Sequence, residues 1–215
     1  MTKTNLTELV FILDRSGSME GLEKDTIGGF NSMLIKQMAI GGEVNVTTIL
    51  FDDSYEVLHK RVPIREMKPV TENEYFVRGT TALLDAIGRA IHEIEPTPKM
   101  KRSNPDADRV LVVIITDGME NSSIEYNIEK INELVFERRT KRGWEFVFLG
   151  ANMDAITEAG KMGIGAECSV QFVHDSVGID LNYEVISKAV SAFRESKWLP
   201  KQWKDTIEKD LRMRG

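Results

Sequence analysis

Cysteine is almost absent from this chain of 215 residues, since Cys168 is the only one. A single thiol excludes an internal disulfide and a zinc cluster built from cysteines. No apolar run approaches the roughly 18 residues that a membrane-spanning helix needs. No apolar stretch typical of a signal peptide follows Met1 either. We therefore expect a cytoplasmic protein that does not bind membranes.

The chain also has fewer basic than acidic residues. The chain has 28 lysine and arginine residues against 34 aspartate and glutamate residues, which gives a formal net charge of −6. Because an acidic surface repels the phosphate backbone, general binding of nucleic acid is disfavoured. Apolar residues make up 41% and charged residues 29% of the chain, which is usual for a globular domain and excludes wholesale disorder.

The apolar residues that are present form short runs without alternation, which are typical of strands buried on both faces. These runs are residues 9–13, 46–51, 110–115 and 146–149. Apolar residues at helical spacing lie at 27–38, 84–94, 124–135 and 185–193. Strands that alternate with helices predict an α/β fold of the Rossmann-like, doubly wound type. It has a mostly parallel sheet with helices on both faces.

One link between strands is too short for a crossover. Residues 51–55 join the second run to a strand predicted at 56–62 with only a turn, so these two strands must pair antiparallel. We therefore expect one antiparallel strand at an edge of the sheet. Residues 96–108 contain three prolines and several charges, which predicts an exposed loop.

The C-terminal segment predicts a separate element. Its apolar residues recur at helical spacing, at Trp198, Leu199, Trp203, Ile207 and Leu211. We therefore divide the chain into a domain at 1–196 and an amphipathic helical extension at 197–215. The apolar face of the extension is expected to pack on the domain.

Carboxylates and hydroxyls gather where the predicted strands end, the edge at which an open parallel sheet binds its ligands. Residues 14–18 (DRSGS) follow the first strand, residues 116–118 (TDG) follow the third run, and residues 79–81 (GTT) precede a helix. None of these segments contains histidine or cysteine. All-oxygen ligation suits a hard cation, above all Mg²⁺. Two carboxylates would leave the ion short of a ligand, which a carboxylate of another molecule could supply.

This pattern resembles the metal-ion-dependent adhesion site (MIDAS) of the von Willebrand factor A (VWA) domains. That site consists of Asp-x-Ser-x-Ser, a distant Thr and a distant Asp. Residues 14–19 (DRSGSM) match its first part, including the Gly and the Met that are frequent in bacterial members. Aligning residues 85–87 (DAI) with the family makes Thr81 the ligand, with Thr80 as the alternative. The resemblance covers roughly residues 5–195.

The resemblance implies the VWA fold and a divalent ion held by Asp14, Ser16, Ser18, Thr81 and Asp117. By the family's pattern the three hydroxyls bind the ion directly, and the two carboxylates often act through water. Mg²⁺ is the expected ion, with Mn²⁺ or Ca²⁺ as alternatives. The implied function is an intracellular, bacterial module that binds an acidic side chain of another protein and is not an enzyme.

Two other functions remain open beside this one. A Mg²⁺ site next to an aspartate could serve phosphoryl transfer, as in the haloacid-dehalogenase-like phosphatases. Those enzymes need a second aspartate two residues after the first, where this chain has Ser16. The chain could also be a scaffold that needs no metal and acts through the tryptophan-rich segment at 197–215.

Other polar residues have simpler interpretations. Asp52 and Asp53 are typical of a hairpin turn rather than of a second metal site. We expect Asp85 to support the loop at residues 79–81 (the threonine loop) or the start of the helix in which it lies. Asn31 and Asn121 are minor candidates for hydrogen bonds to the site. The histidines show no metal-ligand spacing, so we expect structural or surface roles for His59, His92 and His174.

Overall fold

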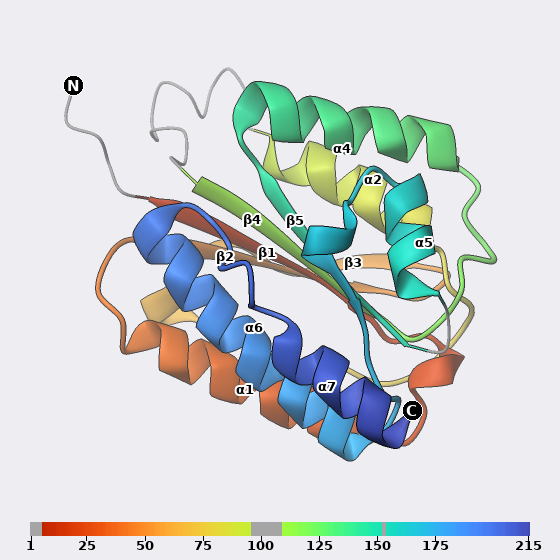
Figure 1. Cartoon of the computed structure of the whole chain (residues 1–215), viewed down its shortest axis with the longest axis horizontal. Helices are drawn as coiled ribbons and strands as arrows, with labels where there is room; N and C mark the ends of the chain where they lie inside the picture. Colours follow the sequence, from red (N-terminus) through yellow and green to blue (C-terminus); the bar gives the residue numbers. More distant parts are fainter. Residues whose placement is uncertain (1–5, 96–108, 152–153) are drawn as a thin grey trace.

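The computed structural model describes residues 6–95, 109–151 and 154–215. In these ranges six strands form one sheet, and helices cover both of its faces (Figure 1). The predicted loop at 96–108 lies outside the described residues. No helix in the described ranges has the length and the apolar character that crossing a membrane requires.

The strands of the sheet are β1 (Thr7–Asp14), β2 (Val44–Phe51), β3 (Tyr55–Pro63), β4 (Arg109–Thr116), β5 (Glu145–Gly150) and β6 (Ser169–Gln171). Their order is β3-β2-β1-β4-β5-β6, and only the pair of β2 with β3 is antiparallel. The mostly parallel sheet and its antiparallel edge strand are thus confirmed. From β1 the chain moves outward to β3, and it later returns to β4 and moves outward to β6 on the other side. This order makes the gap between β1 and β4 a topological switch point.

In the described part of the chain, three helices cover each face of the sheet. One face packs against α1 (Glu23–Met38), α6 (Ser176–Ser196) and α7 (Asp205–Arg214). The other face packs against α2 (Leu83–Ile94), α4 (Ile128–Arg142) and α5 (Ala155–Lys161). The two layers of helices are visible above and below the sheet in Figure 1. The central strands are therefore buried on both sides, as their unbroken apolar runs predict.

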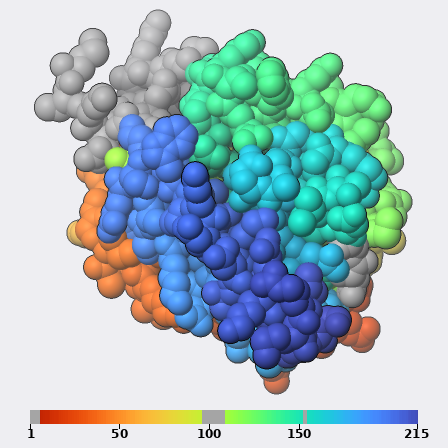
Figure 2. Space-filling view, in the orientation of Figure 1, coloured from red at the N-terminus to blue at the C-terminus, as the bar shows by residue number. Residues whose placement is uncertain are grey.

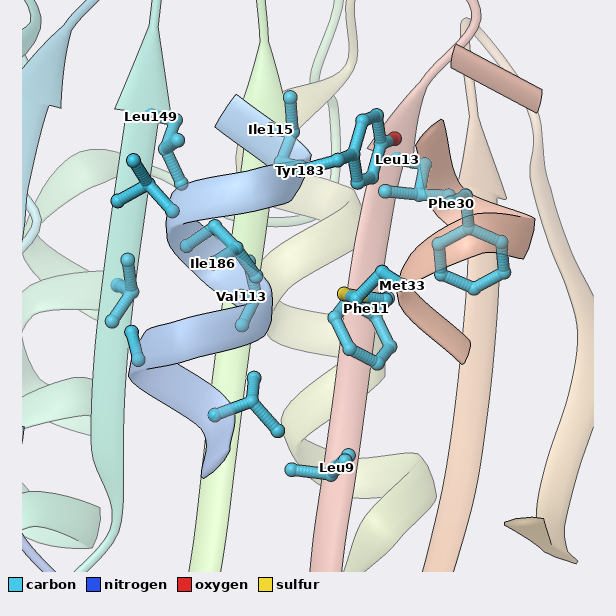
Figure 3. Packing of buried hydrophobic residues seen from close by; sticks show 14 of the residues in the cluster. Leu9, Phe11, Leu13, Phe30, Met33, Val113, Ile115, Leu149, Tyr183 and Ile186 are labelled. Carbon is cyan, nitrogen blue, oxygen red and sulfur yellow. The ribbon is translucent and has the colours of Figure 1, made fainter. Parts of the chain in front are cut away.

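Aromatic rings join the sheet to α1 and α6 (Figure 3). Phe11 on β1 meets Phe30 on α1 edge to face, with ring centroids 5.3 Å apart. Phe30 in turn meets the ring of Tyr183 on α6 at 6.3 Å. Met33 lies next to the Phe11 ring, and Ile186 of α6 lies next to Val113 on β4 (Figure 3). This packing holds α1 and α6 against the sheet below the ends of β1 and β4.

Helix α4 starts later than its apolar pattern predicts. Ile124 is in register with the apolar face, but α4 begins only at Ile128, and Ile124 is 92% exposed. The side chain of Asn127 caps the helix by accepting a hydrogen bond from the Lys130 backbone N–H at 2.9 Å. An N-cap residue takes an extended backbone, so the helix cannot continue toward Ile124.

The C-terminal segment is helical only in its second half. α7 begins at Asp205, and Trp198, which precedes it, is 70% exposed. Trp203 and Ile207 are buried against the rest of the chain, and the indole N–H of Trp203 donates to the Glu167 carbonyl at 2.8 Å. Figure 2 shows this segment in dark blue, lying on α6. The division of the chain at residue 196 stays a prediction.

Replacing Phe30 with Ala should lower the free energy of unfolding by about 3–5 kcal/mol, because a fully buried ring leaves a cavity between α1 and the sheet. Phe136→Ala is the matched control, since this ring on α4 is 64% exposed and its loss should change stability by no more than about 0.5 kcal/mol. Urea unfolding of both variants measures the difference. Equal losses would contradict the packing described here.

Candidate metal centre

The predicted ligands lie at the switch point, where β1 and β4 end side by side. Asp14 is the last residue of β1, and Asp117 directly follows β4. The two strands pair in parallel with Leu13 opposite Ile115. Both carboxylates therefore reach the same edge of the sheet, and both are buried.

Asp14 is held by hydrogen bonds to both of its carboxylate oxygens. Oδ1 accepts from the backbone N–H of Ser16 at 2.7 Å, and Oδ2 accepts from the hydroxyl of Thr116 at 2.5 Å. Burial raises the pKa of Asp14 to about 6, although these hydrogen bonds act in the opposite direction. The charged form of Asp14 is therefore costly without a nearby positive charge.

The three predicted hydroxyl ligands come together beside these carboxylates. The hydroxyl oxygens of Ser16 and Ser18 lie 3.0 Å apart, and the Thr81 hydroxyl donates to that of Ser16 at 3.0 Å. Ser18 also donates to Oδ1 of Asp117 at 2.6 Å. The structure thus brings all five predicted residues into one connected cluster.

Of the two candidate threonines, only Thr81 belongs to the cluster. Thr81 is buried and contacts Ser16, whereas Thr80 is exposed. Two backbone hydrogen bonds align this loop with the loop at residues 14–18 (the serine loop). Gly17 N–H donates to the Gly79 carbonyl at 3.1 Å, and Arg78 N–H donates to the Arg15 carbonyl at 2.9 Å.

Gly79 has a φ of +66°, which an L-residue with a side chain rarely adopts. The glycine therefore permits the turn that directs Thr81 inward.

Asp52 connects the same loops through hydrogen bonds to two arginines and to the backbone of a turn. Its Oδ2 accepts from Nε of Arg15 at 2.9 Å and from Nε of Arg78 at 2.7 Å. Its Oδ1 accepts from the backbone N–H of Ser54 at 2.6 Å, which forms the predicted turn. Arg15 lies between Asp14 and Ser16 in the sequence and is fully buried. Its ion pair with Asp52 therefore anchors the serine loop.

Asn121, a minor candidate for hydrogen bonds to the site, joins the loop after β4 to Thr81. Its side-chain oxygen accepts from the backbone N–H of Thr81 at 2.9 Å, and its backbone N–H donates to the Thr81 carbonyl at 3.0 Å. Asn31 makes a similar pair of hydrogen bonds with Val70, away from the cluster. Asn121 is therefore the asparagine that positions a predicted ligand.

Asp85 has a different function from the expected one. Its carboxylate accepts hydrogen bonds from the backbone N–H groups of Ile124, Glu125 and Tyr126, at 2.9 to 3.0 Å. It therefore organises the segment that follows Asp117, rather than the threonine loop.

His174 is a residue of the site that the sequence analysis missed. It lies in the loop between β6 and α6, and its Nε2 is 2.6 Å from Oδ2 of Asp117. Burial raises the pKa of Asp117, while the hydrogen bond from Ser18 and the charge of His174 act to lower it. No sequence spacing could reveal this contact, because it forms only when β6 is added to the sheet.

The donor set fits a hard divalent cation. Neighbouring ligands of an octahedral ion with bonds of about 2.1 Å lie about 3.0 Å apart, as do the hydroxyl oxygens of Ser16 and Ser18 and those of Ser16 and Thr81. Within residues 6–95, 109–151 and 154–215, no three His, Cys, Asp or Glu side chains lie where they could hold an ion together. An ion bound at this cluster would therefore need the hydroxyls of Ser16, Ser18 and Thr81 as ligands.

The sequence profile of the von Willebrand factor type A domain matches residues 8–179. A search of curated protein sequences found no match. The solved structure of proximal thread matrix protein 1 from the mussel byssus, with a zinc-occupied MIDAS motif, aligns with a TM-score of 0.61 and 16% identity. The alignment covers 86% of this chain and 45% of that one.

Two bacterial proteins have similar structures. The minor pilin PilB from Streptococcus sanguinis aligns with a TM-score of 0.59 and 12% identity, over 87% of this chain and 62% of its own. The conserved hypothetical protein BatB from Bacteroides thetaiotaomicron aligns with a TM-score of 0.55 and 15% identity, over 88% of this chain and 100% of its own. The chain spans less than two thirds of the length of the mussel protein and of PilB. At these identities the likeness shows the fold.

Replacing Gly118 with Ala should weaken Mg²⁺ binding by about tenfold or more, because even about 1.4 kcal/mol of steric conflict corresponds to that factor. The added Cβ would lie 2.6 Å from the Thr81 hydroxyl and 3.0 Å from that of Ser18, so the hydroxyls would have to separate. Gly160→Ala on α5 is the control, since no atom lies within 4 Å of its added Cβ. Titration calorimetry compares the two variants, and equal affinities would contradict the convergence of these hydroxyls.

Proposed function

Because the chain belongs to the von Willebrand factor type A family, we propose that it is a protein-interaction module with a Mg²⁺-binding MIDAS. The ion would be held by Ser16, Ser18 and Thr81, with Asp14 and Asp117 behind them, and would accept an acidic side chain of a partner protein. The observation that supports this proposal is the cluster of three neutral hydroxyls and two buried carboxylates at one sheet edge.

The charge of the cluster supports a divalent ion. Asp14 and Asp117 are both buried, and burial of an uncompensated carboxylate is unfavourable. A bound Mg²⁺ supplies two positive charges and a coordination position for a further oxygen ligand. The hydroxyls of the chain add no negative charge, so a carboxylate of a partner remains an attractive ligand. Mn²⁺ and Ca²⁺ stay alternatives to Mg²⁺.

The surface beside the cluster supports a protein as the partner. Phe76 and Met119, which lie in the loops that form the cluster, are 42% and 61% exposed. The guanidinium of Arg78 lies 5.3 Å from the centre of the Phe76 ring. Exposed aromatic, methionine and arginine side chains are enriched in protein interfaces.

We favour binding of a partner protein over catalysis as the function of this site. In the described part of the chain, no histidine hydrogen-bonds to the hydroxyl of Ser16 or Ser18, whose partners are each other, Thr81 and Asp117. A serine nucleophile needs an adjacent base to activate it. The cytoplasmic location and the bacterial origin stay predictions from the sequence.

Thr81→Ala should abolish the heat of Mg²⁺ or Mn²⁺ binding, because it removes one of three direct ligands while the fold is retained. Thr80→Ala is the matched control, since this exposed neighbour does not touch the cluster and its loss should leave the affinity unchanged. Calorimetry with each salt, together with melting curves in EDTA, measures both effects. Absence of heat from the unaltered chain would overturn the proposed metal site.

The role of the metal in partner binding is tested by purification from native cells. We expect a protein that is retained by the unaltered chain with Mg²⁺, is released by EDTA and is not retained by Thr81→Ala. Trp198→Ala tests the scaffold alternative, because this exposed side chain lies in the tail away from the cluster. A partner that resists EDTA but is lost with Trp198→Ala would favour the scaffold over the metal-dependent module.

A further inference from the structure

His174 approaches the metal centre from a loop that no part of the MIDAS pattern includes. Its Nε2 lies 2.6 Å from Oδ2 of Asp117, and both atoms are buried. The angle of this contact departs from that of an ideal hydrogen bond, and neither atom has another hydrogen-bond partner among the described residues. Because two lone pairs at this distance would repel, a proton must lie between these two atoms. An ionised Asp117, the form in which a carboxylate binds a metal, places that proton on Nε2 of the imidazole.

This contact leaves the two oxygens of Asp117 with different partners. Oδ1 accepts the hydroxyl of Ser18 at 2.6 Å, whereas Oδ2 faces His174. The side chain of Asp117 is fully buried, so water does not compete for either oxygen. The carboxylate is therefore held from two sides, with Oδ1 turned toward the hydroxyl cluster.

The loop that presents His174 is itself firmly anchored. Oδ1 of the adjacent Asp175 accepts from the Gly178 N–H at 2.7 Å and caps α6. Its Oδ2 accepts from Arg214 at the end of α7 at 2.5 Å. Ser176 donates to Oδ2 of Asp25 on α1 at 2.5 Å. The position of the imidazole is thus determined by three helices, and not by its own side chain alone.

We propose that His174 is a positioning residue of the metal centre. It holds Oδ2 of Asp117, so that Oδ1 stays with Ser18 and faces the ion. This inference rests on the proposed metal-binding function and adds a residue to it. Groups that hydrogen-bond to a metal ligand from behind orient that ligand, and their loss typically costs about 10- to 100-fold in metal affinity. We assign an effect of that size to the imidazole N–H.

The experiment compares two substitutions of His174 in the full chain. His174→Phe keeps a ring of similar size but lacks a donor, whereas His174→Gln keeps an N–H donor at the end of its side chain. His92→Phe is the matched control, since this half-exposed histidine lies on α2 and contacts Glu95. Calorimetric titration with Mg²⁺ and with Mn²⁺ gives the dissociation constants, and melting curves in EDTA report the stability of each metal-free variant.

We expect His174→Phe to raise the dissociation constant by about tenfold or more, His174→Gln to restore most of the affinity, and His92→Phe to leave it unchanged. A purely structural role of the ring would make Phe the better replacement, so recovery by Gln and not by Phe identifies the donor. The inference is overturned if the unaltered chain binds metal and His174→Phe binds it equally well, or if Gln restores nothing. Absence of binding by the unaltered chain would overturn the proposed function together with this inference.

Discussion

The parallel pairing of β1 with β4 is the constraint on which the candidate metal centre depends. With Leu13 opposite Ile115, the last residue of β1 lies beside the last residue of β4, and the Thr116 hydroxyl reaches the Asp14 carboxylate. A shift of this register by one residue would turn alternate side chains to the opposite face of the sheet. Asp14 would then lose Thr116, and the serine loop would no longer face Asp117. The buried packing of α1 and α6 maintains the register that the site requires.

The pairing of these strands also creates an electrostatic cost. It buries two carboxylates at one edge, and burial raises the pKa of both, to about 6 for Asp14. Hydrogen bonds from Thr116, Ser18 and the backbone of Ser16 offset part of this cost. A divalent cation offsets more of it, because it provides the opposite charge at short range. The same feature that strains the metal-free site therefore favours its binding of metal.

The loops around the site keep a defined geometry although they are far apart in the sequence. Backbone hydrogen bonds connect the serine loop with the threonine loop, and Asn121 connects the threonine loop with the segment after β4. Asp52 and Asp85 complete this frame, the first with two arginines and the second with three backbone N–H groups. A ligand set of neutral hydroxyls binds a metal weakly unless its oxygens are held at the correct separation, so the proposed metal binding would depend on this frame.

The sequence by itself determined strands β1 to β5, the mostly parallel sheet, its antiparallel edge strand and the residues that meet at one edge of the sheet. It did so because apolar runs, short links and turn residues are local signals. Only the tertiary structure decided which threonine faces the cluster, where α4 begins, how much of the tail is helical and that His174 lies against Asp117. Each of these depends on a contact between distant segments, and such a contact leaves no period or spacing in the chain. The candidate ligands were thus identified from short motifs that resemble those of a family, whereas the contacts that hold them together are visible only in the fold.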